Sequence, residues 1–319
     1  MGPMTRLLVQ RISLGLLLLF LVSIVIFVGT MVLPGDVAQQ ILGQSATPEA
    51  LANLRAELGV DQPPMARYFD WLGGLMTGDL GTALTSGQSI NEAVGRRFSN
   101  TLFLAVSAAI IAVPLAIFLG LLAVRYQERW PDKLISATTL TTISMPEFVI
   151  GYILMFVLGV QLGWFPPTSV GFRPEADLFT RLNSIAIPVL VLTLVVLAHM
   201  MRMTRAAILN VMQSAYIETA ELKGMPMLKI IRKHAFPNAI APVVNVVMLN
   251  LAYLVVGVVV VEVVFVYPGM GQYLVDHVTK RDIPVVQACG MIFAAIYIGL
   301  NLVADVVSIL TNPRLRHPK

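Results

Sequence analysis

Six stretches of this chain contain no Asp, Glu, Lys or Arg, and they constrain its fold more than any other feature. They cover residues 12–35, 98–124, 148–172, 182–201, 238–261 and 283–304. Because an α-helix rises about 1.5 Å per residue, about 20 residues are enough to cross the hydrocarbon core of a bilayer. Each stretch reaches this length, so the chain is predicted to cross a membrane six times.

The composition excludes several other classes of protein. The chain has 319 residues, of which 57% are apolar and 13% charged, against about 45–50% and about 25% in soluble domains. An ordinary soluble enzyme, a disordered protein and a nucleic-acid-binding module are therefore excluded. Within lipid only helices and closed barrels satisfy the backbone, and runs such as LVVGVVVVEVVFV at 254–266 lack the alternation of barrel strands. We expect an all-α integral membrane protein with helices near 9–33, 100–124, 135–162, 184–208, 238–266 and 285–310.

The remaining charges predict which way these helices run. With six crossings both termini lie on one side, and that side holds 14 of the 22 Lys and Arg residues and a net charge of +10, against −3 opposite. Cytoplasmic loops carry an excess of Lys and Arg, so both termini are predicted to be cytoplasmic. The excess of positive charge is therefore explained by membrane topology, and it gives no reason to expect a nucleic-acid partner.

Turn-forming residues suggest how the chain is organised. Residues 1–98 are predicted to form one transmembrane helix and an extracytoplasmic helical segment, with short helices that start at Pro48 and Pro64 and end at Gly59 and Gly78. Residues 99–319 are predicted to form a five-helix core. The first apolar stretch runs about 20 residues into LPGD, which favours an uncleaved helix over a secretory signal peptide.

Motifs for catalysis, for metals and for phosphate binding are missing from the sequence. It contains no GxxxxGK[ST], HExxH or GxSxG, and its four histidines and single Cys289 form no cluster. We therefore expect no catalytic residue, no metal site and no cofactor on this chain. Glu147, Glu262 and Asp305 are the ionisable residues within the apolar segments, few for a carrier that powers itself by ion coupling. A transport path powered from outside the chain fits better, with Glu147 and Glu262 as candidate lining residues; a stand-alone channel or carrier and a scaffold remain alternatives.

The longest basic loop, at about 205–237, has the pattern of a helical elbow. A helical segment that continues the fourth span is expected to end at Gly224, a residue typical of helix C-termini. Pro226 is suited to the first turn of a second short helix, and Pro237 closes the loop. The sequence thus predicts a helix–turn–helix projection that could seat in a groove of a partner. Alternatively, Glu218 is only a solvated charge, and Lys229, Arg232 and Lys233 serve only the charge bias.

This loop and six other segments resemble one family of membrane proteins. The order Glu218-Thr219-Ala220, Gly224 and HAFPN at 234–238 resembles the EAA-type coupling loop of ABC importer permeases, and the form of the loop is similar to the dipeptide/oligopeptide/nickel group. Other matching segments are LGVDQPPMARYFDWL at 58–72 with GDLGTAL at 78–84, EVVF at 262–265 with YPGMG at 267–271, RDIPVVQ at 281–287 and NPRLR at 312–316. Thr219 and Asn312 depart from the usual alanine and aspartate of these motifs, without affecting the geometry of the elbow.

The resemblance implies a type I ABC importer permease fold in a bacterial inner membrane. It also implies a second related permease subunit, two ATPase subunits that carry ATP and Mg²⁺, and an extracytoplasmic binding protein. The residues it assigns to ATPase coupling are Tyr216, Glu218, Thr219, Ala220, Lys223, Gly224, His234 and Pro237. Peptide-like solutes are the favoured substrates, and nickel complexes, glutathione and opine- or sugar-like solutes are the alternatives.

Overall fold

The computed structural model describes residues 3–32, 37–57, 59 and 62–311. This part of the chain is helical and contains no β-strand, only an isolated bridge between Thr82 and Ser89. Five of its helices are long and apolar enough to cross a membrane: α1 (Pro3–Val32), α5 (Ile90–Arg125), α9 (Ala186–Met212), α12 (Phe236–Val264) and α14 (Ile283–Thr311). The all-α prediction is confirmed. The LPGD and NPRLR motifs lie outside the described residues.

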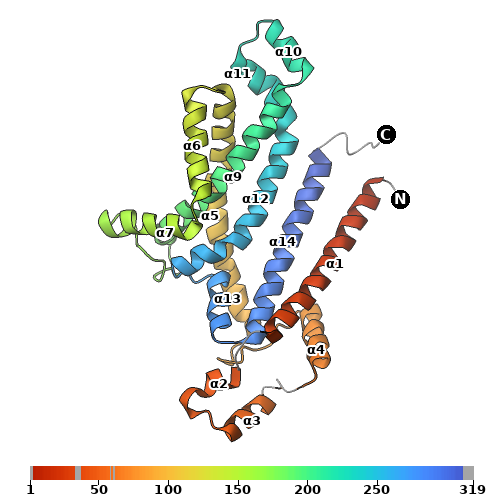
Figure 1. Ribbon diagram of the computed structural model, residues 1–319, viewed down its shortest axis with the longest axis vertical. Helices are drawn as coiled ribbons and strands as arrows, with labels where there is room; N and C mark the ends of the chain where they lie inside the picture. The colour runs from red at the N-terminus through yellow and green to blue at the C-terminus, as the bar shows by residue number, and fades with distance from the viewer. Residues whose placement is uncertain (1–2, 33–36, 58, 60–61, 312–319) are drawn as a thin grey trace.

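The long helices lie side by side along the long axis of the molecule (Figure 1). α5 packs along α9, α12 packs against both α9 and α14, and α1 packs against α14. α1 and α14 run antiparallel, and Arg11 of the first forms a 2.9 Å ion pair with Asp305 of the second. The start of α1 and the end of α14 therefore lie at the same end of the molecule (Figure 1), as the predicted even number of crossings requires.

Small side chains allow α5 to approach α9 closely. Ala105, Ala112, Ala116 and Gly120 are buried along one face of α5. A Cβ atom added at Gly120 would lie 3.0 Å from a methyl group of Thr204 on α9. Close approach of helix backbones favours van der Waals packing where lipid supplies no hydrophobic driving force. This stripe of small residues, spaced by seven, four and four positions, packs within the chain.

The third predicted span, 135–162, is wrong as a single helix. It is broken into α6 (Trp130–Ser144) and a segment formed by α7 (Glu147–Leu154) and the π-helix η2 (Met155–Gln161), with a bend of 104° between them. Proline disfavours helical geometry in the residue before it, and Met145 and Pro146 are extended, with ψ values of 134° and 141°. As a result, α7 projects sideways from the helix bundle (Figure 1). The two pieces count as the sixth span only if they cross the membrane together.

Short helices lie mainly toward the end opposite α10 and α11 (Figure 1). They are α2 (Val37–Leu42), η1 (Gly43–Ser45), α3 (Pro48–Glu57) and α4 (Pro64–Thr77), followed further along the chain by α8 (Leu178–Ser184) and α13 (Met270–Thr279). The hydroxyl of Thr47 accepts a hydrogen bond from the N–H of Ala50 at the start of α3, and Gly78 ends α4 with φ of +79°. Tyr68 of α4 packs edge-on against Phe27 and shares a hydrogen bond with Ser23, so α4 is attached to α1.

Candidate functional site

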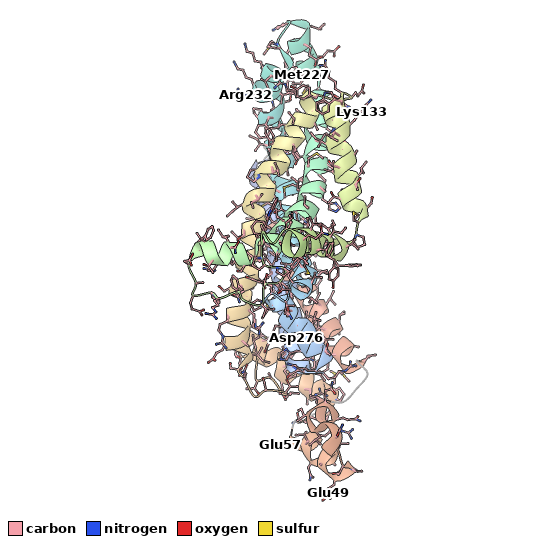
Figure 2. The ribbon with its side chains drawn as sticks, turned by 90° about the vertical axis from the view of Figure 1, so that its left-hand side faces the viewer. Glu49, Glu57, Lys133, Met227, Arg232 and Asp276 are labelled. Carbon is pink, nitrogen blue, oxygen red and sulfur yellow. The ribbon has the colours of Figure 1, made fainter. Side chains whose placement is uncertain are left out.

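The elbow predicted from the basic loop projects from one end of the molecule. We define it as residues 213–235, which comprise α10 (Ala215–Leu222), α11 (Met227–Ile230) and the π-helix η3 (Ile231–Ala235). Figure 1 shows α10 and α11 beyond the ends of the neighbouring helices, and Figure 2 shows Met227 and Arg232 at this end, with Glu49 and Glu57 at the other. The start of the loop does continue the fourth span as a helix, but only to Met212, where α9 ends. One helix as far as Gly224 is wrong, because the chain turns before α10 begins.

Gly224 forms the turn of the elbow, as predicted. Its φ of +73° lies in the left-handed region that favours glycine. Its N–H donates to the carbonyl of Glu221, and the N–H of Met225 donates to the carbonyl of Ala220. This pair of bonds is the Schellman arrangement that satisfies the last carbonyls of a helix. Pro226 then precedes α11 with φ of −65° and ψ of 140°, so local chemistry sets both ends of the turn.

Apolar side chains attach the underside of the elbow to the long helices. Ile217 and Ala220 of α10 and Ile230 of α11 are buried in one apolar cluster. The other members of the cluster come from the ends of α5 and α9, from η3 and from the start of α12, and they are Val124, Ile208, Ile231, Ala235, Ala239 and Val243. Packed apolar groups of this kind resist changes of volume and transmit strain. A force on α10 would therefore reach the ends of three membrane-spanning helices.

The coupling residues implied by the resemblance fall into three places. Tyr216, Glu218, Thr219, Lys223 and Gly224 are exposed along α10 and its turn. Ala220 is buried beneath them, whereas His234 and Pro237 lie at the base of the elbow, where η3 joins α12. The structure thus leaves the first five accessible on different sides of α10 and its turn, and places the other three beneath α10 or at the base of the elbow.

Sequence reasoning missed an exposed apolar residue at the tip of the elbow. Leu222, in the last turn of α10, is 83% exposed, and Tyr216, in the first turn of the same helix, is 45% exposed. Large apolar side chains exposed together mark surfaces for contact with partners. The signal was available, because Ile217 and Ala220 share the inner face at a three-residue spacing, which turns Leu222 outward.

A bidentate ion pair joins α6 to α9. The guanidinium of Arg205 on α9 donates to both carboxylate oxygens of Asp132 on α6, at 2.9 and 2.8 Å. Asp132 is 4% exposed and also accepts a hydrogen bond from the N–H of Glu128. Paired bonds of this kind fix orientation as well as distance. Arg205 was counted only toward the charge bias in the sequence, and nothing there pairs it with Asp132.

Glu147, one of the two candidate path residues, lies at the break in the third span. It is the first residue of α7 and is partly exposed. Its carboxylate accepts a 3.0 Å hydrogen bond from the hydroxyl of Tyr253, which is in the middle of α12 and 47% exposed. An ionisable side chain within a membrane-spanning region is costly unless it serves a function or has a partner. The partner is Tyr253, and both side chains remain accessible.

Glu262, the other candidate, has a different environment. It is fully buried, and its carboxylate accepts hydrogen bonds from the hydroxyl of Thr101 at 2.6 Å and from the N–H groups of Gly271 and Gln272 at 2.7 and 3.2 Å. The Thr101 hydroxyl accepts in turn from the N–H of Met270. Because these N–H groups belong to the first turn of α13, Glu262 satisfies the start of that helix as a capping residue would.

The glycines near Glu262 make room for this contact. A Cβ atom at Gly269 would overlap the Glu262 carboxylate, and one at Gly271 would lie 2.7 Å from the Cα of Val259. Neither position has a positive φ, so the requirement is for space and not for an unusual backbone. The YPGMG segment is thus explained by the close approach of α13 to α12.

A second buried carboxylate holds the same end of the molecule. Asp282 is fully buried, and it accepts hydrogen bonds from the N–H groups of Leu84 and Thr85 and from the Thr85 hydroxyl, at 2.7 to 3.2 Å. These bonds join the loop before α5 to the turn before α14. We call the assembly formed by residues 79–91, 100–101 and 262–287 the collar.

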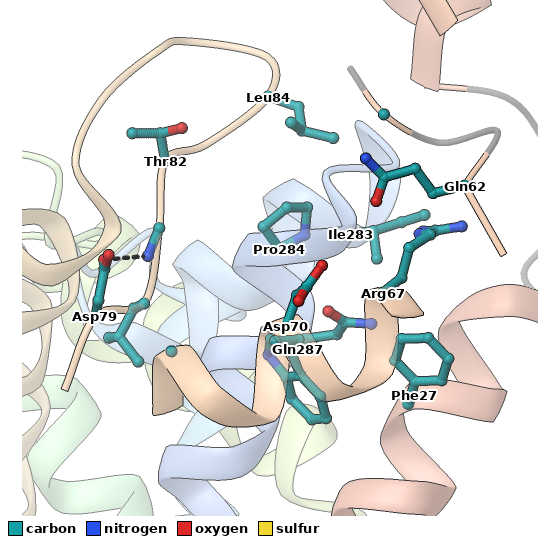
Figure 3. A pocket seen from close by; sticks show the side chains of 15 residues that line it. Phe27, Gln62, Arg67, Asp70, Asp79, Thr82, Leu84, Ile283, Pro284 and Gln287 are labelled. Atoms are coloured by element: carbon teal, nitrogen blue, oxygen red, sulfur yellow. Dashed lines mark hydrogen bonds between the residues drawn. The ribbon is translucent and has the colours of Figure 1, made fainter. Parts of the chain in front are cut away.

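A polar cavity of about 400 Å³ lies beside the collar, between α1, α4 and the start of α14 (Figure 3). Gln62, Arg67, Asp70 and Gln287 line it, with Phe27 at one side (Figure 3). The Gln287 amide also donates to the buried hydroxyl of Thr30, which attaches α14 to α1. Within the described ranges no group of three or more His, Cys, Asp or Glu side chains could hold a metal ion.

Helices that span a membrane, a projecting elbow and a hydrogen-bonded collar define a polytopic membrane protein with a helical projection at one end. Comparison with known proteins identifies its family. Residues 112–317 match the family described as binding-protein-dependent transport system inner membrane component, and residues 4–117 match its N-terminal companion. The chain belongs to this family.

Named relatives align with nearly the whole chain. The glutathione transport system permease protein GsiC of Salmonella typhimurium is 36% identical over 94% of this chain and 95% of its own length. A Brucella abortus protein, whose name assigns it to peptide transport system permeases, is 33% identical over 98% of this chain and all of its own length. The protein is therefore a permease subunit of an ABC importer in the inner membrane. Its partners include a binding protein and an ATPase.

Proposed function

We propose that this chain forms half of the translocation path for a peptide-like solute. In this proposal a second related permease forms the other half, two ATPase subunits with ATP and Mg²⁺ dock on the elbow, and the binding protein delivers solute at the collar end. The chain itself carries no catalytic residue. Relatives named for peptide and for glutathione transport support the class of solute, and nickel complexes and opine- or sugar-like solutes are the alternatives. The charge bias supports an elbow, and both termini, on the cytoplasmic side.

One observation supports the coupling role: the elbow has exposed residues on α10 and buried apolar residues packed against the long helices. Tyr216, Glu218 and Leu222 of α10 are exposed and available to a partner, while Ile217 and Ile230 are buried against the ends of α5, α9 and α12. When ATP draws two ATPase subunits together, the elbow moves with them as a lever. The spans then alternate between inward-open and outward-open states, whose relative populations ATP and solute shift.

The two candidate path residues, Glu147 and Glu262, are proposed to have different roles. Glu147 and Tyr253 are accessible polar groups on α7 and α12, which supports a position along the path for this pair. All hydrogen bonds of the Glu262 carboxylate come from within the collar. This supports a contribution to the path through the shape of the collar, without contact between Glu262 and the solute.

The test replaces Gly224 with valine in the complete importer reconstituted with its binding protein. A β-branched residue is a genuine outlier at positive φ, so the turn and the contact surface of the elbow are expected to change. Solute uptake and solute-stimulated ATP hydrolysis should both fall at least tenfold. Gly163→Val is the matched control, because Gly163 also has a positive φ, +63°, with nothing within 4 Å of a Cβ atom. Full uptake and full stimulation in Gly224→Val would overturn the coupling role.

The solute is identified by the same reconstituted complex. Uptake of a labelled dipeptide, an oligopeptide, glutathione and a nickel complex is compared with the cognate binding protein present. We expect peptide-like solutes to be taken up and to compete with each other. Uptake confined to the nickel complex would contradict the proposed class of solute and leave the role of the elbow untouched.

A further inference from the structure

An apolar cavity lies between one side of the elbow and the last turns of α5. It has a volume of about 390 Å³. Its apolar lining comes from α5 on one side and from α11, η3 and the start of α12 on the other: Phe118, Leu121, Leu122, Leu228, Ile231 and Phe236. No residue of α10 lines it, so it is distinct from the exposed surface proposed for the ATPases.

The cavity continues an apolar stripe along α5. Exposed large side chains follow this helix at steps of three or four residues, with one adjacent pair, and they are Leu102, Val106, Ile110, Ile111, Leu115 and Phe118. Phe118 is 58% exposed and is both the last member of the stripe and part of the cavity lining. A stripe of this composition on a membrane-spanning helix suits contact with acyl chains. The cavity therefore opens where α5 leaves the apolar layer.

Positive charge appears directly beyond this point. Arg125, the first charged residue after the stripe, lines the cavity from α5, and Arg232 lines it from the elbow. A second cavity, of about 510 Å³, adjoins it through Leu228 and Arg232, and its other lining residues include Lys229 and Lys233. No acidic residue lines either cavity. The two adjoining cavities together have a mainly apolar lining on one side and a basic lining on the other.

We propose that this paired cavity binds an anionic glycerophospholipid of the leaflet on the elbow side. One acyl chain fills the apolar cavity between α5 and the elbow. The phosphate group lies between Arg125 and Arg232, and the basic side chains at 229 and 233 surround the rest of the headgroup. Basic pockets at the membrane boundary are suited to anionic headgroups.

Charge and position favour lipid over a protein occupant. A partner subunit would have to supply both an apolar wedge and a cluster of acidic groups, whereas an anionic lipid combines the two in one molecule. The occupant would also be supplied by the surrounding bilayer, along the exposed stripe of α5. Because the lipid would touch both α5 and the elbow, its presence would stiffen their junction, and coupling would depend on the lipid composition of the membrane.

The test compares two lipids on the purified importer complex. Delipidated complex in detergent is titrated with phosphatidylglycerol or with phosphatidylcholine of the same acyl chains, and bound lipid is counted by native mass spectrometry. If each arginine near the surface favours an anionic headgroup about fivefold, the wild type should prefer phosphatidylglycerol by about 25-fold. Arg125→Gln with Arg232→Gln should remove most of this preference, whereas Arg125→Lys with Arg232→Lys should keep most of it.

Two further variants separate the tail from the headgroup. Leu122→Trp fills the apolar cavity and should lower the binding of both lipids alike. Arg129→Gln removes an exposed arginine between α5 and α6 that lines neither cavity, and it should behave as the wild type. The proposal is overturned if the wild type binds both lipids equally, if the double glutamine variant keeps the preference of Arg129→Gln, or if lipid binds the isolated chain but not the assembled complex.

Discussion

The elbow and the collar lie toward opposite ends of the same helices and are held in opposite ways. Beneath the elbow, apolar side chains such as Ile217 and Ile230 pack without directional bonds, while the charged residues of α10 remain exposed. In the collar, the buried carboxylates of Glu262 and Asp282 each accept three hydrogen bonds. Apolar packing depends on area and tolerates small shifts, whereas hydrogen bonds to a buried carboxylate depend on geometry.

This difference suggests how the two ends divide their tasks. An end that must follow moving partners is served by a packed body with an exposed contact surface. An end that must keep one shape for a delivered solute is served by directional bonds that are lost together when a donor or acceptor is removed. If so, the side chain whose removal lowers the free energy of unfolding most should lie in the collar and not beneath the elbow.

Removal of the Glu262 carboxylate should have the largest effect. Glu262→Ala leaves the N–H groups of Gly271 and Gln272 and the Thr101 hydroxyl without their acceptor. At about 1–3 kcal/mol for each of these three unsatisfied groups, a loss of about 3–9 kcal/mol is expected. Thermal unfolding of the purified protein measures it. Glu262→Gln retains an acceptor oxygen and should lose less than half as much; equal stability of the two variants would contradict the capping role.

Truncation beneath the elbow should have the next largest effect. Ile217 is fully buried, and Ile217→Ala is expected to cost about 2–4 kcal/mol. Hydrogen exchange should accelerate in residues 213–235 and remain unchanged in the collar. Ile240→Ala serves as the control, because Ile240 is 42% exposed on α12 and should lose little. Acceleration that spreads equally into the collar would show that the two ends are not independently held.

The second carboxylate of the collar should have a smaller and more local effect. Asp282→Ala frees the loop before α5 by removing the acceptor of Leu84 and Thr85. Because this loop can rehydrate, a loss of about 1–3 kcal/mol is expected. Hydrogen exchange at residues 79–91 should rise and that of the elbow should not. Unchanged exchange in this loop would mean that Asp282 is not what holds it.

Removal of an exposed carboxylate that caps a helix should have the smallest effect on stability. Asp177 caps α8, and hydrogen bonds from the hydroxyl and the N–H of Thr180 lower the pKa of its carboxyl. A lowered pKa in the folded state means that this stabilisation is present above the unfolded pKa and is lost as pH falls through the folded one. The difference in unfolding temperature between the wild type and Asp177→Ala should therefore be small at neutral pH and vanish in acid. A difference that persists in acid would rule out the ionised cap.

Local chemistry made the helical elements and the elbow predictable. Five of the six charge-free stretches correspond to the five long helices, and the sixth, 148–172, covers the second half of the broken pair and the loop after it. Each charged residue in lipid is costly by itself, so its absence can be recognised from the sequence alone. The turn at Gly224 and the start of α11 after Pro226 follow from backbone preferences of single residues. In the same way, Pro146 signals a break in the third span.

Tertiary contacts account for what the sequence did not reveal. Pro146 disfavours a continuous helix, but the 104° angle depends on how α6 and α7 pack against α9. Glu262 and Asp282 could be recognised as capping groups only once the elements distant in sequence that donate to them were brought together. The pairing of Asp132 with Arg205 joins residues 73 positions apart. Polar partners of this kind leave no periodic pattern in a single chain.

The most direct test of the account asks whether the elbow is where the ATPase subunits dock. Cys289 is buried, so Leu222→Cys adds an accessible thiol at the tip of the elbow, and Phe179→Cys adds one on α8, where Phe179 is 79% exposed. Maleimide labelling is measured in the assembled importer and after the ATPase subunits are stripped from it. The account predicts that the thiol at position 222 is protected at least tenfold by the ATPases, whereas the thiol at position 179 reacts equally in both. Equal labelling at position 222 with and without the ATPases would contradict the account.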